Sequence, residues 1–197
     1  MLVSVRRFLV VLSPFCFNRT STAEERYRVS NTAMVAKSQA VDMGQASFVA
    51  EADAIWRIPA PSAASDVNLA LRITNRSDDV LRFPLDVVRI DLMGSDGVPL
   101  RIDGGRDGLK AGGPFSKLVA PGESLVISRR GRLERRLDRI LRLIGSDNLG
   151  GVWYFDGLRP DRYILNFEYE NHAIDPAEGP EVWIGQVRTP ALEIEVQ

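Results

Sequence analysis

Apolar and polar residues alternate with a period of two along most of the chain from residue 47 onward. In the clearest stretch, Val67, Leu69, Leu71 and Ile73 are separated by residues that are mostly polar. Successive side chains of a β-strand point to opposite faces, so this period predicts a strand with one buried face. Similar alternation occurs in residues 48–58, 81–92, 98–102, 118–127, 152–155, 163–169, 182–187 and 192–196.

Turn-forming residues separate these stretches. Clusters rich in Asn, Asp, Gly and Ser lie within residues 75–79, 94–97 and 156–161. About eight or nine short strands with such turns between them are typical of an antiparallel sandwich. The sequence therefore predicts an all-β, antiparallel immunoglobulin-like β-sandwich over residues 45–197. A parallel α/β fold is disfavoured, because helical patterns do not alternate with the strands.

One segment departs from the period of two. Between Arg129 and Ile144, apolar residues recur at helical spacing, which predicts a short inserted helix over about residues 131–144. The same segment holds seven arginines and two acidic residues. Two interpretations remain open: residues 129–142 bind anionic surfaces, or the helix plugs an open end of the sandwich with its leucines while its arginines stay solvated. The candidate contacts of an anion-binding surface are Arg135, Arg136 and Arg139.

The N-terminal residues resemble a secretory signal. Arg6 and Arg7 precede the mostly apolar residues 8–17, and the small residues 21–23 follow at a distance suited to cleavage. Residues 1–23 are therefore predicted to be a signal peptide and the polar residues 24–44 a linker, which makes the protein exported and periplasmic or envelope-associated. In the alternative, residues 1–23 are a disordered leader, and a start of translation at Met34 makes the protein cytoplasmic.

Composition removes several classes of function. The chain has 197 residues and a net charge of −1, so no global field recruits nucleic acid. Beyond the leader, no apolar run approaches the roughly 20 residues of a transmembrane helix, so none is expected in the mature chain. One cysteine and one histidine disfavour a disulfide framework, a zinc centre and histidine-dependent catalysis. No metal, no cofactor and no enzymatic activity are expected.

Two weak chemical signals have ordinary structural explanations. Asp96, Asp103 and Asp107 are spaced through glycines, but they do not match a calcium-binding loop and are interpreted as turn residues. His172 has no serine nucleophile in a suitable setting, and it is interpreted as a histidine at the edge of a loop.

Aromatic residues near the C-terminal strands offer a candidate binding surface. Trp153, Tyr154 and Trp183 could form a platform on which a sugar ring stacks. Adjacent residues of a strand face opposite ways, so one of Trp153 and Tyr154 is expected on the surface unless both faces of the sheet are covered.

Three short motifs resemble those of bacterial immunoglobulin-like domains related to the intracellular proteinase inhibitor family. They are the turn Ala120-Pro-Gly-Glu-Ser124, the strand end Asn75-Arg-Ser77 and the segment Leu158-Arg-Pro-Asp-Arg-Tyr-Ile-Leu165, which has Asp161 where glycine is usual. The resemblance implies a sandwich fold. The third motif is shared with fibronectin-like sandwiches, in which the tyrosine hydroxyl bonds back to the turn backbone. The family name also implies inhibition through a presented loop, for which residues 103–114 are the best candidate.

Three hypotheses of function follow. The leading one is a non-catalytic binding or structural module of the bacterial envelope, whose partner is a protein or a surface polymer. The first alternative is a proteinase inhibitor that acts through residues 103–114. The second is a peripheral protein that binds anionic surfaces through residues 129–142.

Overall fold

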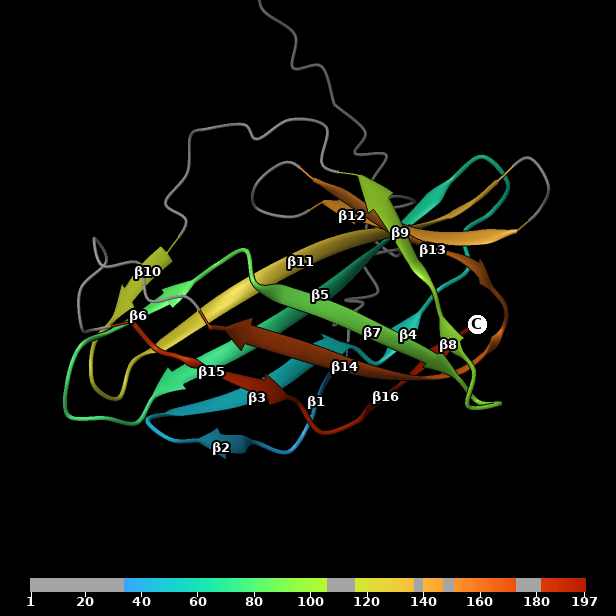
Figure 1. The fold of residues 1–197 in the computed structure, drawn as a ribbon. Coiled ribbons are helices and arrows are strands. Elements are labelled where there is room, and N and C mark those ends of the chain that lie inside the picture. The colour runs from blue at the N-terminus through green and yellow to red at the C-terminus, as the bar shows by residue number, and fades with distance from the viewer. Residues whose placement is uncertain (1–33, 106–115, 137–139, 147–150, 173–181) are drawn as a thin grey trace, which may run out of the picture. The chain divides into compact units, whose positions relative to one another are not determined.

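The chain folds into β-strands arranged in antiparallel sheets (Figure 1). The computed structural model describes residues 34–105, 116–136, 140–146, 151–172 and 182–197, all of which belong to one compact unit. These residues contain no helix. The all-β prediction is confirmed, whereas the predicted leader at 1–23 lies outside the described residues.

The larger sheet has the strand order β1-β3-β5-β11-β12-β13-β9, and β2 also pairs with β3. All of its pairings are antiparallel. Its strands are β1 (Val35–Lys37), β2 (Val41–Met43), β3 (Ala46–Asp53), β5 (Ala64–Asn75), β9 (Ile102–Gly105), β11 (Ser124–Arg135), β12 (Leu141–Ser146) and β13 (Val152–Leu158).

The second sheet has the strand order β4-β16-β14-β7-β8, and β15 also pairs with β14. The short pairing of β4 with β16 is parallel, and the others are antiparallel. Two further strands, β6 and β10, form a small sheet of their own. The bounds are β4 (Ile55–Trp56), β6 (Leu81–Pro84), β7 (Val88–Gly94), β8 (Pro99–Leu100), β10 (Ser116–Val119), β14 (Asp161–Asn171), β15 (Gly185–Arg188) and β16 (Leu192–Val196).

One hydrophobic core is shared by the inward faces of both sheets. In β5, the four residues that define the period of two, from Val67 to Ile73, are at most 1% exposed. Tyr163, Leu165, Phe167 and Tyr169 of β14 are buried in the same way. The ring of Phe48 on β3 lies 5.6 Å from that of Tyr169, which joins the two sheets. Alternation therefore predicted the buried faces of these strands correctly.

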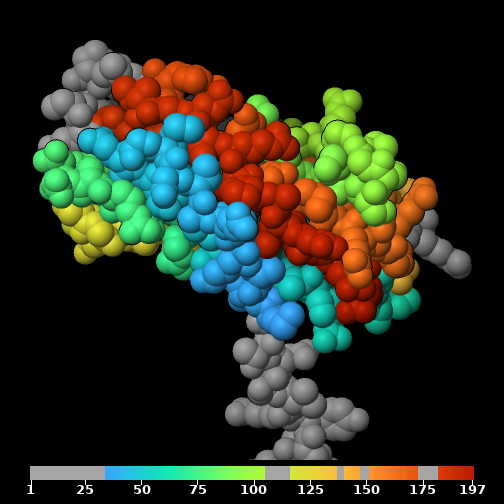
Figure 2. Space-filling view, turned by 90° about the horizontal axis from the view of Figure 1, so that it is seen from below, coloured from blue at the N-terminus to red at the C-terminus, as the bar shows by residue number. Residues whose placement is uncertain are grey.

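The strands β1 and β2 lie inside residues 24–44, the range that the residue pattern assigns to a linker. Both pair with β3, and Val35 stands opposite Asp53. Figure 2 shows these N-terminal strands, in blue, beside the red C-terminal strands, in agreement with contacts of β1 with β16 and of β2 with β15. The folded domain therefore begins before residue 45.

The prediction of a helix over residues 131–144 is wrong, because the described residues of this segment form strands. β11 continues to Arg135 and pairs with β12, with Leu133 opposite Leu143, while residues 137–139 lie outside the described part of the chain. Every second residue of β11 from Leu125 to Leu133 is buried, as a strand requires. Two of these buried positions hold Arg129 and Gly131 instead of large apolar residues, so the sequence does not show the alternation. Pairing with β5 along nearly the whole of β11 supplies backbone hydrogen bonds that a helix would have to replace.

Two of the three family-like motifs meet at one end of the larger sheet. The amide of Asn75 donates to the carbonyl of Glu123 over 3.0 Å, and the amide of Gly122 donates to the carbonyl of Asn75 over 2.9 Å. The Asn75 side chain is fully buried and donates to the carbonyls of Asp79 and Val119. This Asn-Arg-Ser motif therefore serves folding, because its buried side-chain amide ties the end of β5 to the backbone of two neighbouring segments.

The third motif forms the expected bond at the turn between β13 and β14. The hydroxyl of Tyr163 accepts from the amide of Arg159 over 2.9 Å and donates to the carbonyl of the same residue over 3.2 Å. Burial is the main cause that raises the pKa of Tyr163, so its hydroxyl remains protonated and able to donate. The bond that the motif implies is confirmed.

Candidate binding groove on the outer face of the larger sheet

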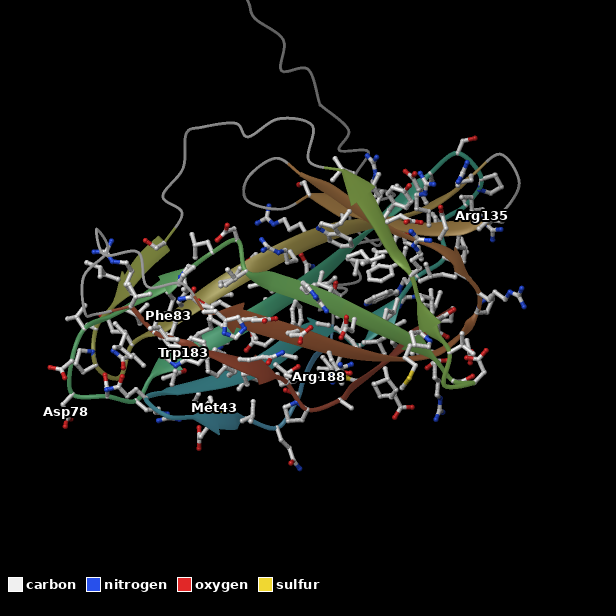
Figure 3. All side chains as sticks on the ribbon, viewed as in Figure 1. Met43, Asp78, Phe83, Arg135, Trp183 and Arg188 are labelled. Carbon is white, nitrogen blue, oxygen red and sulfur yellow. The ribbon has the colours of Figure 1, made fainter. Side chains whose placement is uncertain are left out.

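The two candidate tryptophans are core residues. Trp153 is 9% exposed and Trp183 is 4% exposed. The ring of Trp183 lies 5.2 Å from that of Phe48 and 6.3 Å from that of Phe83, beside which Figure 3 shows it. The ring of Trp153 instead contacts Phe155 at 6.2 Å. The structure therefore does not bring the two tryptophans together on the surface, since their rings fill separate parts of the interior.

Tyr154 faces the opposite side of β13 from Trp153, as the alternation of a strand requires. The guanidinium of Arg142 lies 4.2 Å from the centre of its ring. Arg142 also donates two hydrogen bonds of 2.7 Å to Asp156. These bonds lower the pKa of the Asp156 carboxyl and raise the pKa of Arg142. Tyr154 thus belongs to a packed cluster of charged and aromatic side chains.

The candidate arginines do not form an open basic surface. Arg135 donates to the carbonyl of Pro59 over 3.1 Å, and Arg136 pairs with Asp156 at 3.5 Å. Arg132 pairs with Glu134 at 3.4 Å. Arg139 lies outside the described residues. Glu134 and Asp156 thus engage Arg132, Arg136 and Arg142, and ion pairs of this exposed kind leave the geometry with little support for anionic surfaces as partners.

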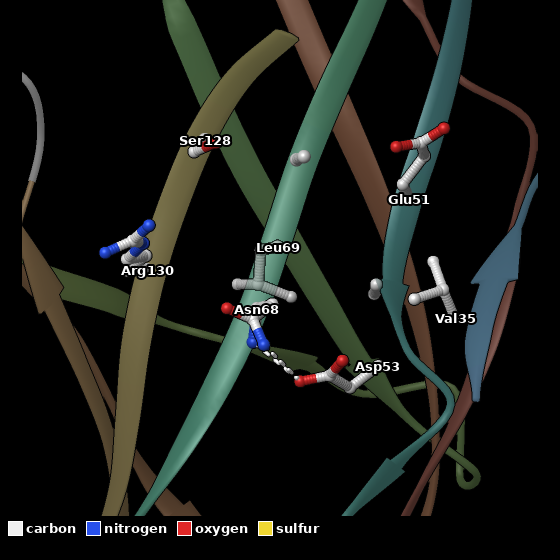
Figure 4. A pocket seen from close by; sticks show the side chains of 9 residues that line it. Val35, Glu51, Asp53, Asn68, Leu69, Ser128 and Arg130 are labelled. Carbon is white, nitrogen blue, oxygen red and sulfur yellow. Dashed lines mark hydrogen bonds between the residues drawn. The ribbon is translucent and has the colours of Figure 1, made fainter. Parts of the chain in front are cut away.

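A groove on the outer face of the larger sheet brings together residues that no sequence motif connects (Figure 4). It has a volume of about 200 Å³ and crosses β3, β5 and β11. Ala52, Ala70 and Ser128 are its small residues, and the other lining residues have longer side chains. Its lining residues are Val35, Glu51, Ala52, Asp53, Asn68, Leu69, Ala70, Ser128 and Arg130.

Asp53 supplies a buried carboxylate to this groove, and it is only 6% exposed. Its Oδ2 accepts from the amide of Asn68 over 2.8 Å and from Nδ2 of the same residue over 3.1 Å. Its Oδ1 is buried and has no hydrogen-bond partner among the described residues. A buried polar atom without a partner costs about 1–3 kcal/mol, and more when it is charged, so this oxygen requires a physical explanation.

The backbone around Asp53 is held in place. Its carbonyl accepts from the indole nitrogen of Trp56 over 2.9 Å, and Trp56 is itself 1% exposed. On the neighbouring strand, Ala52 pairs with Leu69, which sets Asp53 beside Asn68. The carboxylate therefore sits on a rigid part of the sheet rather than on a loop.

Glu51 forms the second acidic group of the groove, but its oxygens are occupied. It pairs with Nε of Arg72 at 2.8 Å and with the ammonium of Lys37 at 2.9 Å. The bond from Arg72 is the largest cause that lowers the pKa of Glu51. Glu51 is thus held ionised and already neutralised.

Arg130 closes the groove on the β11 side. It is exposed, it stands opposite Asn68 in the pairing of β11 with β5, and the structure shows no hydrogen bond or ion pair of its side chain with another described residue. Asp53, Asn68 and Arg130 therefore follow one another across three adjacent strands. Two strand spacings put the backbones of Asp53 and Arg130 roughly 10 Å apart.

The sequence alone could not reveal this groove. Alternation places Glu51 and Asp53 on the polar face of one strand, which is an ordinary solvated face until its neighbours are known. The signal that was available is that two acidic residues share one face of a strand whose other face is apolar. Which residues stand beside them depends on the register with β5 and β11.

No protein-family model matches the sequence, and no curated protein is significantly similar to it. Among the described residues, no three His, Cys, Asp or Glu side chains gather in a way that could hold a metal ion. The described part of the chain also lacks any helix long and apolar enough to cross a membrane.

Proposed function

We propose that this protein is a non-catalytic binding module of the bacterial envelope and that it binds its ligand in the groove across β3, β5 and β11. One observation carries the proposal: Asp53 lines the groove, and its Oδ1 is buried without a hydrogen-bond donor among the described residues. A ligand that brings an N–H or O–H group to this oxygen would satisfy it, and the complex would then avoid the free-energy cost of a buried acceptor without a donor. The exposed Arg130 on the opposite side supplies a second point of attachment.

The chemistry of the groove supports binding rather than catalysis. A pair of carboxylates catalyses proton transfer when one of them keeps its proton near neutral pH, which requires a raised pKa. Glu51 has a lowered pKa because Arg72 bonds to it. Ser128 is the hydroxyl of the groove, and the groove lining contains no histidine that could activate it.

The order of the strands supports an immunoglobulin-like arrangement of the two sheets. β3, β5 and β11 are consecutive neighbours in one sheet, and β16, β14 and β7 are consecutive neighbours in the other. Immunoglobulin domains place their strands A, B and E side by side in one sheet and G, F and C in the other. If these six strands of the chain are taken in sequence as A, B, C, E, F and G, the two orders coincide.

Export to the envelope is the part of the proposal that rests on the leader sequence. Cleavage after residue 23 leaves a mature chain that begins at Glu24. Mass determination of the protein purified from its native cells tests this. A mature chain that starts at Glu24 supports export, and an intact N-terminus in a soluble cytoplasmic fraction contradicts it.

Binding in the groove is tested by nuclear magnetic resonance with a library of small neutral, cationic, anionic and zwitterionic fragments. We expect the amide shifts of Ala70, Ser128 and Asp53 to move with the fragments that bind. Val35→Trp fills the entrance of the groove without changing its charge and should abolish these shifts. Asp66→Asn, an exposed residue of β5 that is not among the groove-lining residues, is the matched control. Shifts that gather on another surface, or none at all, overturn the proposal.

A further inference from the structure

We infer that the ligand of the groove is a short peptide with free amino and carboxyl groups, bound with its ammonium at Asp53 and its carboxylate at Arg130. The inference rests on the proposed function, since it names the chemistry that the same groove selects. It is carried by the order of three side chains across the sheet: a carboxylate with a free oxygen, an amide, and a guanidinium without a partner among the described residues.

The Asp53 end requires a hydrogen-bond donor. Its Oδ2 already has two donors from Asn68, so the acceptor that remains is Oδ1. An ammonium group is the donor that best suits a buried carboxylate, because it supplies both the hydrogen bond and the opposite charge. Val35 stands opposite Asp53 on β1, lines the same groove and is 53% exposed.

The Arg130 end requires an anion. The guanidinium matches a carboxylate in shape and donates to it through two parallel N–H groups. The matched comparison on the same strand face is Arg132, whose guanidinium is occupied by Glu134 at 3.4 Å. Arg130 is therefore the arginine of β11 that is ready to receive a carboxylate at the groove.

The pairing of charges favours a ligand that carries both signs. Glu51 is already paired with Lys37 and Arg72, whereas the structure shows no ion pair of Asp53 or Arg130 with another described residue. A simple amine leaves Arg130 unpaired, and a simple carboxylate leaves Asp53 unpaired. A ligand with both groups neutralises both ends in one binding event.

Size sets the length of the ligand. The volume of about 200 Å³ is below the 300–1,000 Å³ typical of sites for drug-sized molecules. The backbones of Asp53 and Arg130 are roughly 10 Å apart. Both residues line the groove, and the side chains of a strand stand roughly perpendicular to its sheet. A dipeptide, whose charged groups lie at the two ends of a short chain, fits this span, whereas Ala70 and Ser128 leave room for its backbone.

Calorimetric titration with diglycine, N-acetyldiglycine and diglycinamide tests the inference. Acetylation removes the ammonium and amidation removes the carboxylate. We expect each change to weaken binding at least tenfold. Asp53→Asn should weaken diglycine binding at least tenfold as well, and it should have little further effect on N-acetyldiglycine, because both changes remove the same contact.

The same logic applies at the other end of the groove. Arg130→Gln should weaken diglycine at least tenfold and leave diglycinamide little changed. The control variants Asp66→Asn and Arg132→Gln keep the charge pattern of the groove and should bind diglycine within twofold of the unaltered protein. If Asp53→Asn proves poorly folded, Val35→Trp provides the second test, since it should abolish diglycine binding without touching either charge.

The outcomes separate this inference from the proposed function. If fragments bind in the groove but diglycine binds no better than its acetylated and amidated forms, the ligand class is wrong and the groove remains a binding site. If diglycine binds equally to the unaltered protein and to Val35→Trp, it binds elsewhere and the inference fails. If no fragment binds in the groove, both proposals fail.

Discussion

The indole ring of Trp153 lies against the backbone of Gly145, its neighbour on the adjacent strand. A Cβ atom on Gly145 would lie 2.2 Å from Cζ2 of this ring and 2.7 Å from the carbonyl oxygen of Arg130. Gly131 of β11 stands opposite Gly145, and a Cβ atom on Gly131 would lie 3.3 Å from Cη2 of the same Trp153 ring. The two glycines make room for a tryptophan that would otherwise be pushed out of the core.

We predict that Gly145→Ala destabilises the protein by about 1–3 kcal/mol, the usual cost of forcing an extra carbon into a packed core. The clash includes a backbone oxygen, which cannot move as freely as the end of a side chain. Urea unfolding monitored by tryptophan fluorescence measures the change. Ser146→Ala, at an exposed neighbouring position, is the control and should remain within about 0.5 kcal/mol. An unfolding free energy for Gly145→Ala equal to that of the control would contradict this packing.

We predict that Tyr163→Phe lowers the free energy of unfolding by about 0.5–1.5 kcal/mol, the net value of a typical intramolecular hydrogen bond. The hydroxyl is the group that ties the turn at Arg159 to β14. Tyr154→Phe is the matched control, because its ring is half-buried and the structure shows no hydrogen bond of its hydroxyl with another described residue. Equal losses in the two variants would mean that the turn does not depend on the Tyr163 hydroxyl.

The sequence predicts the structure well where a strand has one apolar face and one polar face, or where a short motif specifies a local bond. The apolar alternation from Val67 to Ile73 predicted the inward face of β5, and a short motif predicted the bond of Tyr163. It failed in β11, because Arg129 and Gly131 occupy inward positions and residues on either side also fit a helical spacing. Local periodicity cannot separate these cases, since the deciding factor is pairing with β5, more than 50 residues earlier in the chain.

The sequence alone does not predict the groove. Asp53 looks like an ordinary polar residue on an exposed face, and its burial arises because β1 and β5 flank it on either side. Arg130 reaches the same row through the register of β11 with β5. A shift of one residue in either pairing would move these side chains to the opposite face. Sites of this kind depend on long-range register, which local pattern does not contain.

Acid pH should destabilise the protein through Glu51 and Asp156. Arginine partners lower the pKa of both carboxyls in the folded state. The unfolded chain then binds more protons than the folded chain near the ordinary pKa values of about 4, so the free energy of unfolding decreases as the pH falls through this range. The stabilisation is fully present above about pH 5 and is lost as the pH falls through the lowered values.

Asp156→Asn tests this pH dependence. The variant lacks one of the two carboxyls, so its free energy of unfolding should change less between pH 6 and pH 3 than that of the unaltered protein. Urea unfolding at several values of pH measures both curves. Asp66→Asn is the control, because the structure shows no polar contact of its side chain with another described residue, and its curve should run parallel to that of the unaltered protein. An unchanged slope in Asp156→Asn would show that the Arg142 pair does not contribute.

The two acids of the groove should respond in opposite ways to the loss of their charge. In Glu51→Gln, Arg72 and Lys37 lose a carboxylate that both of them contact, so we expect a loss of about 1–3 kcal/mol. In Asp53→Asn, the amide oxygen can still accept from Asn68, and an uncharged amide nitrogen takes the place of the unpartnered oxygen. The buried charge is removed, while one buried polar atom without a partner remains. We therefore expect the unfolding free energy of Asp53→Asn to stay unchanged or to rise by up to about 1 kcal/mol.

This contrast follows from what the two carboxylates do. Residues kept for a ligand are commonly suboptimal for the stability of the free protein, whereas structural residues are not. Urea unfolding of the two variants in the absence of any ligand measures the difference directly. If Asp53→Asn lost as much stability as Glu51→Gln, its carboxylate would be a structural group that is satisfied within the fold. The case for a ligand at Oδ1 would then have no physical basis.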